Sequence, residues 1–222
     1  MAKVIDGKKI AREILIDLKN KVDKYEKKPG LAVILANDDD SSKVYVAQKE
    51  KKSLALGYKS CIYRFDKSIT QGKLVQFIHE LNEDKNVNAI LVQLPLYKHL
   101  NEQQIIELID PKKDVDGFHP INVGKLNCGL KPYALCCTPK GIVKLLKAYN
   151  ISLSGKNVVV IGRSNIVGKP VATLLSQENA TVTLAHSKTK NLKSITKEMD
   201  IIISATGHSK LIKADMEKKV LL

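Results

Sequence analysis

Two side chains with complementary chemistry lie four residues apart in the first half of the chain. Tyr45 and Lys49 would share one face of a helix that the pattern predicts over residues 42–56, with Ser42 as its expected N-cap. A phenol ring beside an ammonium group could hold a flat heterocycle and present a group for proton transfer. The alternative is a solvated lysine and a half-buried packing tyrosine, which is the usual fate of such residues.

An amide and a carboxylate follow later in the chain. Gln93 stands at the end of the apolar run 89–94, and open α/β sheets bind ligands beyond the carboxyl ends of their strands. In the alternative interpretation, Gln93 only satisfies nearby backbone groups. Asp116 lies in the loop 113–120, whose Asp-x-Asp-Gly order suggests calcium. The other ligands of a calcium loop are missing, and we predict no metal site.

A glycine-containing turn gives the most specific local signal. The apolar run 158–161 enters a loop that begins at Gly162 and ends at Gly168, where a helix is expected. Backbone N–H groups at such a helix start can bind a pyrophosphate, and glycines allow its close approach. The spacing departs from G-x-G-x-x-G, so an ordinary strand-to-helix turn is the alternative.

The next expected strand, 181–185, indicates which dinucleotide would bind. A fold that prefers NAD commonly places an acidic residue there for the ribose 2′-hydroxyl, but His186 and Ser187 follow instead. Arg163 and Ser187 could both reach a 2′-phosphate, which favours NADP. For His186 and Lys188 the alternative is a solvated loop.

The elements that position these residues alternate between strands and helices. Several apolar runs lack polar alternation, as expected for parallel strands buried on both faces. The expected strands are 31–36, 61–63, 89–94, 158–161, 181–185 and 201–205. The expected helices are 10–22, 42–56, 71–81, 102–108, 139–149, 167–177 and 191–197. This order predicts an α/β protein with mainly parallel sheets. Turn residues at 150–155 place a domain boundary after residue 149.

Composition limits the class of protein. The 222 residues are 44% hydrophobic and 27% charged, which excludes disordered and fibrous classes. No apolar run is long enough to cross a membrane, and the charged N-terminus does not resemble a signal peptide, so a cytoplasmic location is expected. The net charge of +14 favours anionic partners. Dispersed lysines and few aromatic residues argue against nucleic acid.

Taken together, the segments resemble the bifunctional methylenetetrahydrofolate dehydrogenase/methenyltetrahydrofolate cyclohydrolase family. Seven short motifs occur in family order and span nearly the whole chain. They are Ser42-x-x-Tyr45-x-x-x-Lys49, Val92-Gln-Leu-Pro95, Lys113-Asp-Val-Asp-Gly-Phe-His-Pro120, Asn122-Val-Gly124, Cys137-Thr-Pro139, Gly162-Arg-Ser-x-x-Val-Gly168 and His186-Ser187.

The resemblance implies a two-domain α/β enzyme. Residues 1–149 would form an N-terminal folate-binding catalytic domain and residues 150–222 a Rossmann-like NADP-binding domain, with a folate cleft between them. A homodimer is also implied. Its reactions would be NADP-dependent oxidation of 5,10-methylenetetrahydrofolate and hydrolysis of the methenyl product to 10-formyltetrahydrofolate, in one-carbon metabolism and purine biosynthesis. A polyglutamylated folate substrate would account for the positive charge.

The resemblance also implies roles for individual residues. Tyr45 would lie against the pterin, Lys49 at the reacting carbon, and Gln93 beside Lys49. Asp116 would bind the pterin N–H groups, and Leu94 would line the substrate site. The NADP-binding set would be Gly162, Arg163, Ser164, Val167, Gly168, His186 and Ser187.

Two departures from the family pattern carry expectations of their own. Asn37 and Asp40 stand where the loop before Ser42 usually carries glycine and proline, and we expect a looser loop. The chain also ends at Leu222, in what should be the next strand, so the NADP-binding domain is expected to be incomplete. A non-catalytic NADP-binding remnant is therefore one alternative function, and a basic nucleic-acid-binding protein is another.

Overall fold

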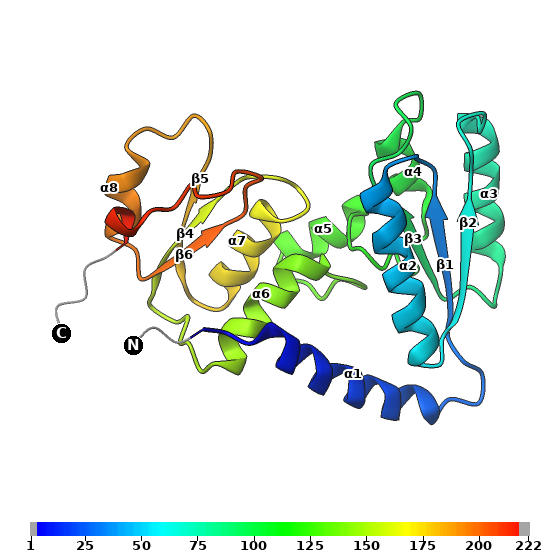
Figure 1. Ribbon diagram of the computed structural model, residues 1–222, viewed down its shortest axis with the longest axis horizontal. Coiled ribbons are helices and arrows are strands. Elements are labelled where there is room, and N and C mark those ends of the chain that lie inside the picture. The colour runs from blue at the N-terminus through cyan, green and yellow to red at the C-terminus, as the bar shows by residue number, and fades with distance from the viewer. Residues whose placement is uncertain (1–3, 218–222) are drawn as a thin grey trace. The chain divides into compact units, whose positions relative to one another are not determined.

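The computed structural model describes residues 4–217, in which strands and helices alternate along the chain (Figure 1). These residues form two compact units. One unit comprises residues 6–122, and the other comprises residues 123–217 together with residues 4 and 5. Within the described residues, no helix is both long and apolar enough to cross a membrane.

The unit of residues 6–122 is built on a three-stranded parallel sheet with the order β2-β1-β3. Parallel neighbours need crossover connections, which helices provide here. The strands are β1 (Gly30–Leu35), β2 (Lys59–Arg64) and β3 (Ala89–Gln93). The helices are α1 (Gly7–Asp23), α2 (Asp40–Ala55), α3 (Gln71–Glu83) and α4 (Glu102–Leu108).

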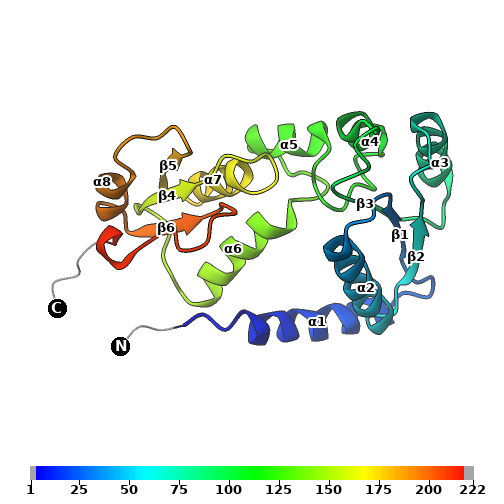
Figure 2. The same ribbon diagram turned by 45° about the horizontal axis from the view of Figure 1, so that its top comes forward.

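Both faces of this sheet are covered. Val46 of α2 packs with Val33 and Leu35 of β1 on one face. On the other face, α3 and α4 bury Leu74 and Ile105 in the larger core. Figure 1 and Figure 2 show α2 and α3 on opposite sides of the strands. Burial on both faces explains why β1 is almost wholly apolar.

The second unit repeats this plan with the strand order β5-β4-β6, again all parallel. Its strands are β4 (Asn157–Ile161), β5 (Thr181–Ala185) and β6 (Ile201–Ser204). Its further elements are α6 (Cys137–Ala148), α7 (Gly168–Gln177), α8 (Leu192–Lys197) and a 3₁₀ turn at Ala214–Met216. Val143 of α6 and Leu175 of α7 pack on one face, whereas Ile195 of α8 packs on the other.

The predicted strands and helices are all present, with ends shifted by a few residues. One helix was missed: α5 (Pro120–Asn127), which spans the division between the units. Its Asn122-Val-Gly124 segment indicates a loop, but Pro120 occupies the first helical position that proline favours.

The compact units divide the chain earlier than the turn residues at 150–155 suggest. Helix α6, placed by sequence in the first domain, buries Val143 and Leu146 in the core of the second unit. The packing boundary therefore follows Asn122. The functional division after residue 149 stays a prediction. The strand expected at Val220–Leu222 lies outside the described residues.

Candidate active site

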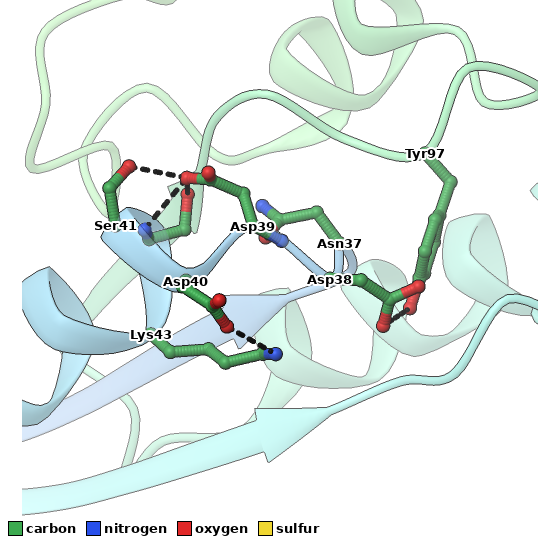
Figure 3. Close-up of polar contacts among 8 residues, drawn as sticks. Asn37, Asp38, Asp39, Asp40, Ser41, Lys43 and Tyr97 are labelled. Carbon is green, nitrogen blue, oxygen red and sulfur yellow. Dashed lines mark hydrogen bonds and ion pairs between the residues drawn. The ribbon is translucent and has the colours of Figure 1, made fainter.

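The N-terminal end of α2 is fixed by a dense set of hydrogen bonds (Figure 3). The N-cap is Asp39, three residues before the predicted Ser42. One carboxylate oxygen of Asp39 accepts hydrogen bonds from the Ser42 backbone N–H (2.8 Å) and from the Ser42 hydroxyl (2.9 Å). The prediction of Ser42 as the N-cap was wrong because α2 begins at Asp40 and is capped by the carboxylate of Asp39. A hydrogen bond from the Ser41 hydroxyl, together with those from Ser42, holds the pKa of Asp39 below its ordinary value.

Lys49 and Gln93 are brought together from α2 and the end of β3. The Lys49 Nζ donates a hydrogen bond to Gln93 Oε1 at 3.2 Å. The Gln93 amide nitrogen in turn donates to the carbonyl oxygen of Leu94 at 2.8 Å. Both side chains are half-buried. Gln93 is thus oriented at both ends of its amide and presents a fixed oxygen to the ammonium group.

Asp116 lies next to this pair because residues 113–115 run alongside β3. Ile90 forms a parallel bridge with Asp114, so the chain direction carries Asp116 toward the carboxyl end of β3. Burial raises the pKa of Asp116, the positive charge of Lys49 opposes that rise, and the charge of Asp114 adds to it. Among the described residues, no group of three or more His, Cys, Asp or Glu side chains could hold a metal ion.

Asp114 is a residue whose role the sequence analysis did not single out. Its buried carboxylate accepts hydrogen bonds from the backbone N–H groups of Gly117 (3.0 Å) and His119 (2.9 Å) and from the Asn122 amide (2.9 Å). These contacts fix the loop that carries Asp116. The spacing of Asp114 before a glycine is typical of such a turn and is the signal that could have revealed it.

Tyr45 and Leu94 complete the predicted set in the first unit. Tyr45 lies one turn before Lys49 on α2, and 61% of its surface is exposed. Its ring is therefore available to a ligand. Leu94 is half-buried and directly follows Gln93, with which it shares the hydrogen bond described above.

In the second unit, the glycine loop packs too closely for side chains. Gly162 has a φ of 121°, and a Cβ there would lie 2.3 Å from the Ala205 carbonyl oxygen. A Cβ on Gly168 would lie 2.0 Å from the carbonyl oxygen of Gly162. Glycine at 162 thus allows the Ala205 carbonyl after β6 to approach, and glycine at 168 brings the start of α7 close to the end of β4. Close packing of this kind is typical of dinucleotide-binding turns.

Ser164 organises the start of α7. Its Oγ accepts hydrogen bonds from the backbone N–H groups of Val167 (3.2 Å) and Gly168 (3.3 Å). Two N–H groups at this helix start therefore donate to Ser164. The sequence had suggested instead that N–H groups here would bind a pyrophosphate. Arg163 is exposed beside them.

The end of β5 lies beside this loop. Ile161 pairs with Ala185, and the Gly162 N–H donates to the Ala185 carbonyl at 2.8 Å. The next residues form a turn in which the His186 N–H donates to Thr189 Oγ1 at 2.8 Å, and the Lys188 N–H donates to His186 Nδ1 at 3.2 Å. Ser187 is exposed. Arg163 and Ser187 thus follow the ends of the neighbouring strands β4 and β5.

The sequences of two known family domains match the two halves of this chain. The model of the tetrahydrofolate dehydrogenase/cyclohydrolase catalytic domain matches residues 5–116, and that of the NAD(P)-binding domain of the same enzymes matches residues 136–221. The chain belongs to the tetrahydrofolate dehydrogenase/cyclohydrolase family.

Individual relatives agree with this assignment. The bifunctional protein FolD of Streptococcus agalactiae is 49% identical over 99% of this chain and 78% of its own length. The structure of the bifunctional dehydrogenase/cyclohydrolase FolD from Campylobacter jejuni has a TM-score of 0.94 at 47% identity, covering 98% of this chain and 78% of that one. The Trypanosoma brucei enzyme, solved with NADP and an inhibitor, has a TM-score of 0.93 at 36% identity, covering 98% and 76%.

The predicted family, two-domain α/β fold and NADP cofactor are confirmed by these matches. So is the prediction of a bifunctional enzyme that acts as dehydrogenase and cyclohydrolase. The alternatives of a non-catalytic NADP-binding remnant and of a nucleic-acid-binding protein gain no support from them.

Proposed function

We propose that the unit of residues 6–122 binds tetrahydrofolate and carries out the hydrolytic step at Lys49, whereas the second unit binds NADP. The enzyme oxidises 5,10-methylenetetrahydrofolate to the methenyl cation and hydrolyses that cation to 10-formyltetrahydrofolate. The observation that carries the proposal is the Lys49 Nζ–Gln93 Oε1 hydrogen bond beside a desolvated Asp116.

Lys49 is the proposed proton carrier of the hydrolysis. Water adds to the carbon between N5 and N10 of the cation, and Lys49, reacting as the neutral amine, accepts one of the water protons. The ammonium form of Lys49 then gives that proton to N5 as the carbon–N5 bond breaks, while the carbinol hydroxyl loses its proton to solvent and becomes the formyl carbonyl on N10. The net reaction releases one proton. Gln93 holds the nitrogen of Lys49 in place through its oxygen during both transfers.

Asp116 and Tyr45 are the proposed pterin contacts. A carboxylate that has lost part of its hydration gains most when N–H donors face it, and the pterin amino and ring N–H groups form such a donor pair. The exposed Tyr45 ring offers an apolar face on the same helix as Lys49. Leu94 lines the site beside Gln93.

NADP is the hydride acceptor in the oxidation. Gly162, Val167 and Gly168 line the proposed pyrophosphate site, where the two glycines allow a close approach. The proposed contacts of the 2′-phosphate are Arg163, Ser164, His186 and Ser187. The exposed guanidinium of Arg163 offers the charge-assisted contact that distinguishes a 2′-phosphate from a hydroxyl. The cation formed by hydride loss is stabilised by its two flanking nitrogens, so this step depends mainly on alignment.

We also propose polyglutamylated folate as the substrate form, a homodimer as the active state, and a cytoplasmic location. The charge of +14 favours a polyanionic substrate. Polyglutamylated folate and NADP both carry several negative charges and do not cross a membrane unaided. This supports a location in the compartment where the two ligands are made. The homodimer is inferred from the family resemblance, and sedimentation of the purified chain tests it.

The division of ligands between the units is tested by thermal melting with each ligand separately. Asp116→Asn should lose most of the stabilisation by a tetrahydrofolate analogue and keep that by NADP. Arg163→Ala should show the reverse. Equal losses of both ligands in either variant would contradict the proposed division.

A further inference from the structure

Two loops at the carboxyl edge of the first sheet are joined by three hydrogen bonds. One loop follows β1 and leads into α2, and the other follows β3. The Asn37 amide nitrogen donates to the carbonyl oxygen of Pro95 at 2.5 Å. The Tyr97 backbone N–H donates to the carbonyl oxygen of Ala36 at 2.8 Å, and its hydroxyl donates to Asp38 Oδ1 at 2.9 Å. Figure 3 shows the Asp38–Tyr97 contact.

The Asn37 side chain is used at both ends. Besides the bond to Pro95, its oxygen accepts a hydrogen bond from the N–H of Asp39, the residue that caps α2, at 3.1 Å. Asn37 is 8% exposed, so loss of its amide would leave groups in a protected place without partners. The expectation that Asn37 loosens this loop was wrong, because its buried side chain forms hydrogen bonds to Pro95 and Asp39 that restrict the backbone of the loop.

Tyr97 supports the same connection from the other loop. It is also 8% exposed, and its hydroxyl lies 3.4 Å from the Phe65 carbonyl oxygen as well as near Asp38. Burial and the neighbouring Asp38 raise the pKa of Tyr97, so the hydroxyl stays a donor well into the alkaline range.

The connection joins the two segments that supply Lys49 and Gln93. The first loop sets where α2 begins, and a helix moves as a rigid body, so its first turn determines where Lys49 lies. The second loop begins directly after Gln93. A shift between these loops would therefore change the Lys49 Nζ–Gln93 Oε1 distance without any change in either residue.

We propose that Asn37 and Tyr97 are positioning residues that hold Lys49 in register with Gln93 for the hydrolytic step. Neither residue bonds to Lys49 or Gln93 in the structure; each acts through the loop that it fixes. The proposal rests on the proposed role of Lys49.

The test compares Asn37→Ala and Tyr97→Phe with the matched control Asn82→Ala. Asn82 makes the same kind of bridge at another place: its amide nitrogen donates to the Leu108 carbonyl oxygen (2.7 Å), and its oxygen accepts from the Asp110 N–H (2.9 Å). Hydrolysis of preformed methenyltetrahydrofolate gives kcat and KM, and thermal melting with NADP reports the second unit. Lys49→Met is measured in parallel.

In Asn37→Ala we expect kcat for hydrolysis to fall on the order of tenfold to a hundredfold, because small displacements of a catalytic group are costly. KM should change by less than about twofold, and Tyr97→Phe should show a smaller fall in kcat. Asn82→Ala should melt earlier but keep kcat. If Asn37→Ala does not fold, Tyr97→Phe decides.

Three results would overturn the proposal. Unchanged kcat in Asn37→Ala and Tyr97→Phe, with Lys49→Met inactive, would overturn it while leaving the role of Lys49 intact. If Asn82→Ala lost as much kcat as Asn37→Ala, then weakening any such side-chain bridge would lower kcat, and Asn37 would have no specific positioning role. Full hydrolysis by Lys49→Met would instead remove the proposed function, and this inference with it.

Discussion

Lys49 and Gln93 are 44 positions apart in sequence, yet the ammonium nitrogen of one lies 3.2 Å from the amide oxygen of the other. The contact follows from the topology: β1 and β3 are parallel neighbours, and α2 leaves the carboxyl end of β1 and runs back over the sheet. A helix residue that points back toward its own N-terminus can then reach the end of the neighbouring strand.

Arg163→Ala should narrow the preference for NADP over NAD. A guanidinium facing an ionised phosphate contributes about 1.5–3 kcal/mol, which corresponds to roughly tenfold to a hundredfold in affinity. NAD carries a hydroxyl at that position and should lose little. Titration of both dinucleotides by fluorescence measures the ratio. Lys156→Ala, an exposed residue just before β4 at the opposite end of that strand, is the control. A ratio unchanged in Arg163→Ala would show that this arginine does not contact the phosphate.

Asp116→Asn should make the ligand-free protein more stable at neutral pH. The pKa of Asp116 is raised in the folded state, so ionisation costs stability as the pH rises from the ordinary value of 3.8 through the raised one. An amide avoids that cost. Melting temperatures measured against pH should therefore favour the variant at pH 7, and the difference should disappear at acid pH.

Asp66→Asn is the control of opposite sign for that series. Hydrogen bonds from Ser68 lower the pKa of Asp66, so its carboxylate contributes stability above the ordinary pKa and loses it as the pH falls. This variant should be less stable than the wild type at neutral pH. If both variants changed the melting temperature at pH 7 in the same direction, burial would not be the cause of the Asp116 effect.

Substitution of the loop glycines should damage the second unit selectively. Alanine at Gly162 or Gly168 places a Cβ within 2.3 Å of a backbone oxygen, so the loop must move and NADP binding should weaken. Gly141→Ala in α6 is the matched control, because nothing lies within 4 Å of its Cβ. Alanine there should stabilise the helix by about 0.5–1 kcal/mol. Melting with and without NADP checks all three, and normal NADP stabilisation in Gly168→Ala would contradict the prediction.

The sequence predicts the fold well because the central strands β1 and β4 are almost purely apolar. The short runs around Val33 and Val159 are typical of strands buried on both faces, and their alternation with amphipathic helices predicts parallel sheets. The same pattern marks Gln93 as a candidate site residue, since it is the first polar side chain after such a run.

What could not be predicted depends on contacts between distant segments. The Asn37 side chain bonds to Pro95, 58 positions away, whereas the departure from the family pattern at Asn37 suggested a looser loop. The structural role of Asp114 could not be distinguished from the role of Asp116 by sequence, because both are carboxylates in one loop and only their hydrogen-bond partners tell them apart. Helix α5 was missed because Asn122 and Gly124 are turn residues by propensity, which tertiary packing overrides.

The central claim is that Lys49 transfers protons in the hydrolytic step, and the loss of methenyltetrahydrofolate absorbance without NADP tests it most directly. Lys49→Met should reduce hydrolysis by about a hundredfold or more, in the range typical of a lost acid–base group. Lys51→Met, on the exposed side of the same helix, should keep the wild-type rate. Both should keep the thermal stabilisation by NADP. Hydrolysis at the wild-type rate by a folded Lys49→Met would contradict the account.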